Sequence, residues 1–542
     1  MKRSNFNYIF FVMVSLTSGM SCKKEFFDKQ PLDAISDRTF WKTESDAQLG
    51  LVGCYYINQE AFGADEFWKG NSILRLESAA GNASCFYPEI NGYTDGTLNS
   101  SNGNIAANWT QAYQKIAACN NFLDHIGEVS MDETKKAIWT AEVRTIRAYE
   151  YFYMALYFGD VPLVDHVLSV DEANSISRSP RADVFAFAEK DLKESFGVLP
   201  KTRPDEENGR ITKAAALAIL GRIQMFEKKW SDAVTTYKTI VEDGDYIIYQ
   251  GGFREQFWEA NELNKEIILS TQYTSSPEHC NATMQQMFPE ANGGWTTYFP
   301  YNELVKEYEC TDGRTIDESP LYDPNNPYDN RDPRLEHTVF ISDRTVFQGI
   351  TYISRPGVGP DGINTHPTQF TGYLLHKFVD DTFTSGSRFM SGQNFTLIRY
   401  AEILLSYLEA QLESGAAIDQ SFLDATINKV RGRATVNMPP VTSTDQAELR
   451  KIVRRERRVE LAFEGLRWYD LIRWDIAAQE LHRQFTGMKL TNNPSSYTDY
   501  PVDDEGYYLF HKKDFVAGKN ELWPIPQSEI TINKNLTQNP GY

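Results

Sequence analysis

Apolar residues recur at helical spacing over a long stretch of the N-terminal half, from about 108 to 159. One stripe contains Trp109, Tyr113, Ile116 and Ala117, and another contains Ala148, Tyr151, Phe152 and Ala155. Positions three and four residues apart lie on the same face of an α-helix. The pattern therefore predicts two long packed helices, and the second one ends at the turn that starts with Gly159.

Further helices are predicted on either side of the middle of the chain. A helix over 182–199 precedes a pair over 212–228 and 231–241, with Ser231 as the N-cap of the second member. Small residues at the expected contacts make the pair look like a tetratricopeptide unit. These residues are Ala214, Ala218 and Gly221. Helical spacing returns over 398–414, 422–433 and 446–464.

The character of the chain changes between about 245 and 394. Clusters of Gly, Pro, Asn and Asp, such as 323–327 and 357–362, replace the periodic pattern and predict loops and short strands. A long irregular insertion is costly to order unless it has a function, so a ligand surface is expected here.

The predicted fold is mainly α, a single domain over 22–542 with a discontinuous scaffold of tetratricopeptide-like helix pairs. Its predicted parts are a helical frame over about 30–244 and 395–485, a loop-rich ligand region over 245–394, and an irregular C-terminal segment over 486–542.

The N-terminus has the pattern of a secretory signal. Lys2 and Arg3 precede an apolar run over 8–14 that is too short to span a bilayer, and small residues then lead to Cys22. The pattern resembles a lipoprotein signal peptide over 1–21, with Cys22 as the lipid attachment site, although Met20 departs from the usual small residue. The alternative is an ordinary secreted protein in which Cys22 lies near the cleavage site by chance. Several acyl chains on one residue would anchor the protein stably.

Composition and charge limit the classes of partner that the protein can bind. The formal net charge of −20 and the pI near 5.0 disfavour nucleic acids and anionic lipid surfaces, because both would be repelled. Aromatic residues make up 13% of the chain, which fits sugar-binding surfaces as well as a packed core.

The sequence contains no common catalytic signature. A nucleophile elbow, a His-Glu-x-x-His zinc motif, a phosphate loop and a dinucleotide fingerprint are all absent, and the eight histidines are scattered. We therefore expect no catalytic residue, no metal and no cofactor. The acidic stretches 323–332 and 503–505 could hold a structural calcium ion, but such loops are more often merely solvated. A row of glutamates at helical spacing predicts ion pairs with neighbouring helices rather than the facing carboxylates of a glycosidase. The row is Glu456, Glu460 and Glu464.

Several ordered motifs resemble the SusD/RagB family of outer-membrane lipoproteins found in Bacteroidetes. They extend from the lipoprotein signal to the last residue and occur over 31–36, 40–47, 142–149, 159–164, 330–335, 398–405, 456–465, 467–471, 523–526 and 538–542. The resemblance implies a cell-surface protein that captures oligosaccharides and delivers them to a SusC-like TonB-dependent transporter in the outer membrane, without breaking bonds. Alternatives are a lid or interaction module of the transporter, a peptide-binding RagB-like member, and a surface glycosidase.

Two aromatic clusters in loops are the best candidates for carbohydrate binding, because they lack the periodicity that would bury their rings. Trp295 follows Asn292-Gly293-Gly294, where glycines leave the indole face open. The predicted binding residues are Trp295 and Tyr298 in one cluster, and Phe86, Tyr87, Asn91 and Tyr93 in the other. The alternative is that these rings only hold their own loops in place.

Overall fold

The computed structural model describes residues 40–56, 66–365, 370–383 and 390–542. The predicted signal segment 1–21, Cys22 and the motif over 31–36 lie outside these residues. In the described part of the chain, no helix is long and apolar enough to cross a membrane.

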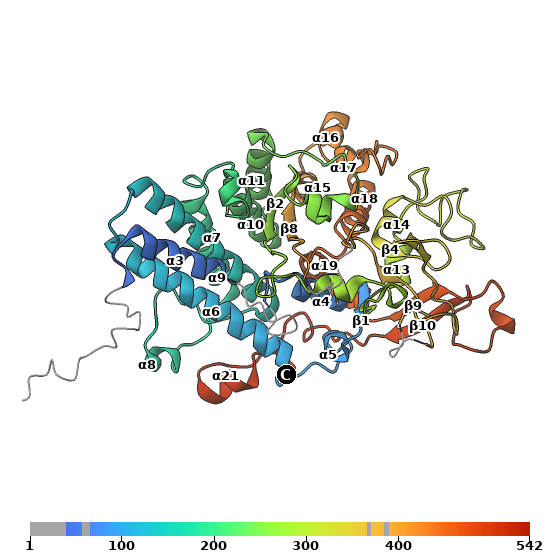
Figure 1. Cartoon of the computed structure of the whole chain (residues 1–542), viewed down its shortest axis with the longest axis horizontal. Helices are drawn as coiled ribbons and strands as arrows, with labels where there is room; N and C mark the ends of the chain where they lie inside the picture. The colour runs from blue at the N-terminus through green and yellow to red at the C-terminus, as the bar shows by residue number, and fades with distance from the viewer. Residues whose placement is uncertain (1–39, 57–65, 366–369, 384–389) are drawn as a thin grey trace, which may run out of the picture.

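Long helices packed side by side build the N-terminal half (Figure 1). The stretch predicted as two helices forms α6 and α7. Helix α6 begins after Asn102, whose Oδ1 accepts hydrogen bonds from two backbone amides at 3.1 Å. Helix α7 ends at Gly159, which has a φ of +74° that favours glycine. The helices of this half are α3 (Glu44–Tyr55), α4 (Gly70–Ala79), α5 (Pro88–Asn91), α6 (Gly103–His125), α7 (Glu133–Phe158), α8 (Val170–Ala173), α9 (Arg181–Ser195), α10 (Lys213–Phe226) and α11 (Trp230–Asp243).

The pair formed by α10 and α11 shows why small residues are needed at a helix contact. A Cβ added at Gly221 would lie 2.4 Å from Cζ of Tyr237, so the two helices could not pack this closely with a larger residue. The predicted N-cap at Ser231 is wrong. The amide of Lys229 closes a tight turn by donating to the carbonyl of Gln224 at 2.8 Å, and α11 therefore begins one residue earlier than Ser231, at Trp230.

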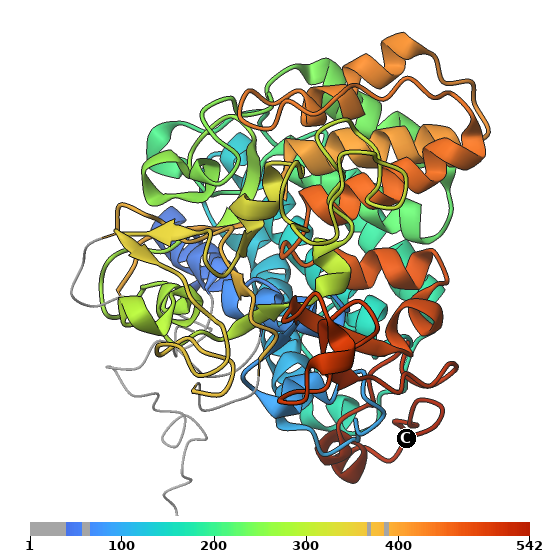
Figure 2. The same ribbon diagram turned by 90° about the vertical axis from the view of Figure 1, so that its right-hand side faces the viewer.

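The described residues from 245 to 394 form mostly loops, with short helices and strands between them. Figure 2 shows part of these loops on the face turned to the viewer, beside helices and strands of the C-terminal part. All strand pairs in the described residues are two-stranded and antiparallel: β1 (Ala83–Cys85) with β3 (Tyr298–Pro300), β2 (Ile267–Thr271) with β8 (Phe395–Arg399), β4 (Val339–Phe340) with β7 (Leu374–Leu375), β5 (Val346–Phe347) with β6 (Ile350–Thr351), and β9 (Gln484–Lys489) with β10 (Tyr507–Lys512).

Helices return in the C-terminal half with three differences from prediction. The helix predicted over 422–433 is interrupted at Thr426 and forms two short helices, over 420–425 and 427–431. The stretch predicted to be helical from 398 starts instead as strand β8, because Ile398 and Arg399 pair with β2. The helix predicted over 446–464 ends at Glu460. The remaining helices are α12 (Thr283–Met287), α13 (Asn302–Val305), α14 (Arg334–Thr338), α15 (Tyr400–Glu413), α16 (Gln420–Ala425), α17 (Ile427–Arg431), α18 (Gln446–Glu460), α19 (Arg467–Arg473), α20 (Ala477–Leu481) and α21 (Gln527–Ile532).

A buried ion-pair network joins the helical frame to the loop-rich region. Glu460 on α18 accepts hydrogen bonds from Arg399 at 2.7 Å, from Arg334 at 2.8 Å and from Arg433 at 3.1 Å. All four side chains are buried. Burial alone would raise the pKa of Glu460, but the three guanidinium groups hold it far below its ordinary value. The carboxylate therefore stays ionised and ties together three segments that are distant in sequence.

Candidate functional site

The strand pair β1–β3 brings the two predicted aromatic clusters together. Cys85 lies opposite Tyr298, and the amide of Phe86 continues the ladder by donating to the carbonyl of Thr297 at 2.9 Å. Because the strands are antiparallel, the end of β1 and the start of β3 lie at the same edge. Phe86 and Trp295, 38% and 41% exposed, are therefore placed at the same end of the pair.

The loop that carries Trp295 is held by a buried carboxylate. Asp361 accepts hydrogen bonds from the amides of Glu290 at 2.8 Å and Ala291 at 3.0 Å, and from the hydroxyl of Thr296 at 3.1 Å. The turn also requires glycine, since a Cβ added at Gly294 would lie 2.1 Å from the carbonyl oxygen of Phe288. The hydrogen bonds to Asp361 and the close packing at Gly294 therefore fix the backbone of the loop that carries the Trp295 indole.

Phe86 and Tyr87 are positioned by polar contacts behind them. Asn91 bonds the end of β1 twice: its Oδ1 accepts from the amide of Cys85 at 3.2 Å, and its Nδ2 donates to the carbonyl of Cys85 at 2.8 Å. The guanidinium of Arg75 lies 4.7 Å from the ring centre of Tyr87, and the rings of Phe86 and Tyr87 meet edge to face at 5.7 Å. Asn91 therefore fixes the backbone at the end of β1, directly before Phe86.

Two of the predicted binding residues, Tyr298 and Tyr93, are buried, so the expectation that their rings are exposed is wrong. Tyr298 is fully buried, and its hydroxyl donates to Oδ1 of Asn71 at 2.5 Å and lies 2.9 Å from Oε1 of Gln286. Tyr93 is also buried and packs against Trp523, with ring centres 5.4 Å apart. Neither ring presents a face to solvent, because strand β3 and the turn after α5 lie against the core. Both residues support the site from inside.

The row of glutamates forms ion pairs with other segments, as predicted. Glu456 binds Arg334 at 2.5 Å and Arg431 at 2.8 Å, and Glu464 binds Arg399 at 2.7 Å. All are buried. Carboxylates that are closed off by guanidinium groups cannot face a substrate, so this row belongs to the scaffold.

No metal site is formed within the residues that the structure describes, where no group of three or more His, Cys, Asp or Glu side chains is placed to hold an ion. In the first acidic stretch, Asp323 accepts from the amide of Asn325 at 2.9 Å and from the side chain of Asn326 at 2.7 Å. In the second, Asp503 accepts from the amides of Glu505 and Tyr507. These carboxylates stabilise their own turns.

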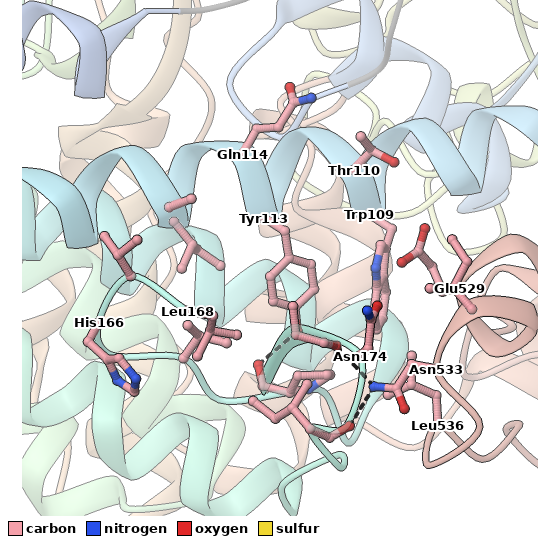
Figure 3. A pocket seen from close by; sticks show the side chains of 18 residues that line it. Trp109, Thr110, Tyr113, Gln114, His166, Leu168, Asn174, Glu529, Asn533 and Leu536 are labelled. Atoms are coloured by element: carbon pink, nitrogen blue, oxygen red, sulfur yellow. Dashed lines mark hydrogen bonds between the residues drawn. The ribbon is translucent and has the colours of Figure 1, made fainter. Parts of the chain in front are cut away.

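A separate pocket of about 490 Å³ lies between α6, the loop before α8, and α21. Figure 3 shows Trp109 and Tyr113 descending from α6 side by side, with Glu529 of α21 next to the indole. The hydroxyl of Tyr113 donates to the carbonyl of Pro162 at 2.8 Å, which fixes the ring against the pocket wall. Phe86 and Trp295 form an aromatic surface at the end of β1–β3, and this pocket shares no lining residue with it.

Comparison with known proteins identifies the family. The sequence pattern that defines the SusD family matches residues 261–542, and a second pattern, described as starch-binding associating with outer membrane, matches residues 55–225. The chain belongs to the SusD family. A SusD-like carbohydrate-binding protein from Bacteroides fragilis has the same fold with a TM-score of 0.87 and 34% identity, over 92% of this chain and 100% of that one.

Other SusD-like proteins align over nearly the whole length. The SusD-like protein P2 of Formosa agariphila is 24% identical, over 95% of this chain and 96% of its own length. A laminarin-binding SusD-like protein of known structure has a TM-score of 0.69 and 25% identity, over 93% of this chain and 100% of that one. The predicted tetratricopeptide-like helical scaffold is therefore confirmed as the SusD fold.

Sequence reasoning missed the residues that support the aromatic surface. Asp361 lies in a Gly- and Pro-rich loop that was expected to be irregular, and no local pattern links it to Trp295. Arg75 sits on the short helix α4, where an arginine is ordinary. The pocket beside α6 was missed because Trp109 and Tyr113 belong to a periodic stripe; the indole is buried, yet both residues line the pocket.

Proposed function

We propose that the chain is a cell-surface protein that binds oligosaccharides and delivers them to a SusC-like TonB-dependent transporter of the outer membrane, without catalysing a reaction. The observation that carries the binding role is the pair of exposed rings, Phe86 and Trp295, that the β1–β3 ladder places at one edge. Aromatic faces suit the apolar faces of sugar rings, and rings held by a fixed backbone bind with little loss of conformational entropy. Relatives that bind carbohydrate or laminarin support this class of ligand.

The binding role is tested by removing the rings one at a time. An aromatic residue at the centre of a binding site contributes about 1–3 kcal/mol on truncation, so Trp295→Ala and Phe86→Ala should each weaken binding about tenfold to somewhat over a hundredfold. Affinity would be measured by calorimetry against a panel of neutral polysaccharides that includes laminarin and starch. Tyr56→Ala is the matched control, because Tyr56 is an exposed aromatic residue (59%) outside the strand pair.

The melting temperature distinguishes the outcomes. Lost affinity with an unchanged melting temperature supports a binding surface. Unchanged affinity with a melting temperature that falls by several degrees shows that the rings only hold their loops, and the site then lies elsewhere. Binding of peptides in place of glycans would favour the RagB-like alternative.

Attachment through Cys22 and the transporter partnership are tested in membranes. Extraction with mild detergent followed by affinity capture should recover a TonB-dependent barrel together with the chain. The variant Cys22→Ala should no longer partition with outer membranes or incorporate labelled fatty acid. Recovery of the chain alone, under conditions that preserve other outer-membrane complexes, contradicts the partnership.

A further inference from the structure

The pocket beside α6 has the walls of an apolar binding site. Twelve of its eighteen lining residues are apolar or aromatic, and its volume of about 490 Å³ falls in the range typical of ligand pockets. Trp109, Tyr113 and Ile116 line it from α6, and Ile532 and Leu536 line it at and after α21. Figure 3 shows Trp109, Tyr113 and Leu536 among the side chains around the pocket. The apolar majority of the lining suits an apolar group.

One charged group in the pocket lacks a counter-ion. Glu529 is half-buried beside Trp109, and within the described residues its carboxylate has no cation or hydrogen-bond donor. The pocket lining contains no lysine or arginine, and His166 is held by Asp165 at 2.8 Å. Burial raises the pKa of the Glu529 carboxyl above its ordinary value, as expected for a charge that has lost water without gaining a partner.

Some carboxylates of this protein that are more deeply buried than Glu529 have counter-ions. Glu142 on α7, for example, is paired with Arg203 at 2.8 Å and with Arg210 at 2.6 Å. Asn174, which is exposed, also lines the pocket. The pocket thus combines apolar walls with one half-buried carboxylate that has no counter-ion, an arrangement that is complementary to a cation next to an apolar group.

The apolar surface continues past the mouth of the pocket. Ile532 and Val167, which both line the pocket, are 66% and 51% exposed. A small molecule in the pocket would leave these side chains in water, whereas a chain that crosses the mouth would cover them. An extended backbone could also pair with the amide of Asn174.

We propose that this pocket is a docking site for a polypeptide segment of a partner protein, in which a large apolar side chain stands next to a lysine or arginine. The apolar side chain fills the space between Trp109 and Leu536, and the cation meets Glu529. The proposal goes beyond glycan binding and does not depend on it, because the pocket and the aromatic surface share no residue.

The test uses three synthetic peptides and the full-length mature protein. The probe is an acetylated and amidated heptapeptide with a central tryptophan–lysine pair. The matched peptides carry glutamate in place of lysine, or alanine in place of tryptophan. Calorimetry should show that the lysine peptide binds about fivefold more tightly than the glutamate peptide, and that the alanine peptide does not bind measurably.

Three variants locate the binding. Glu529→Gln should remove the preference for lysine while the tryptophan still binds. Ala117→Trp, which places a large side chain on the α6 wall, should abolish binding of all three peptides. Glu128→Gln is the control, because it removes an exposed carboxylate of η2 (Ile126–Glu128) that does not line the pocket. Melting temperatures establish that each variant is folded.

The outcomes that overturn the proposal are distinct from failure of glycan binding. Equal binding of the lysine and glutamate peptides, or binding that survives Ala117→Trp, shows that the pocket does not recognise this chemistry. Displacement of the peptide by laminarin oligosaccharides would show that the pocket belongs to a sugar site.

Discussion

Replacing Glu150 with glutamine should stabilise this protein at neutral pH. Glu150 lies on α7 and is buried, and its Oε1 accepts a hydrogen bond from the indole of Trp68 at 2.6 Å. Burial, reinforced by the nearby charge of Glu66, raises the pKa of Glu150 from 4.5 to about 8, against the opposing effects of Lys115 and the indole. Glutamine retains an oxygen acceptor for Trp68 and is neutral at every pH.

The magnitude follows from proton linkage. An acid whose pKa is raised on folding binds its proton more tightly in the folded state, so the free energy of unfolding falls as pH rises from 4.5 and levels off near 8. At pH 7 the loss extends over about 2.5 pH units at 1.36 kcal/mol per unit, which is about 3 kcal/mol. Glu150→Gln should therefore add up to about 3 kcal/mol at pH 7 and almost nothing near pH 4.5.

Urea unfolding of the wild type and the variant at pH 5, 6, 7 and 8 measures this difference. The gap between the two midpoints should widen from pH 5 to pH 8, whereas Glu128→Gln, a change at an exposed position, should follow the wild type throughout. A constant gap, or a variant that is less stable at pH 7, would show that Glu150 is charged and compensated in the folded protein, and the reasoning from burial would be wrong.

Two further predictions concern the support of the aromatic surface and the buried network. Asp361→Ala should weaken glycan binding several-fold although Asp361 is buried, because the Trp295 loop loses three hydrogen bonds; affinity and tryptophan fluorescence would measure this, and unchanged values for both would contradict it. Glu460→Gln should lower stability by about 3–5 kcal/mol, since Arg399 and Arg433 lose a buried counter-ion; a melting temperature within a degree of the wild type would refute that assignment.

The helical frame could be predicted from the sequence because its signals are local. The stripe containing Trp109 and Tyr113 repeats at the period of an α-helix, and Gly159 supplies a backbone conformation that ends α7. The exposure of Phe86 and Trp295 was also predicted, because both lie outside any periodic segment and Trp295 follows two glycines.

Which residues come together at the aromatic surface was decided only by the tertiary structure. Phe86 and Trp295 are distant in sequence, and they share an edge because β1 pairs with β3, a choice that depends on packing rather than on either segment alone. The same pairing buries Tyr298, which the sequence pattern could not distinguish from its exposed neighbour Trp295. The periodicity of α18 predicted that Glu460 would form an ion pair, but the partners Arg399 and Arg433 are fixed by how distant segments fold around the helix, because a charge interacts with whatever the fold places beside it.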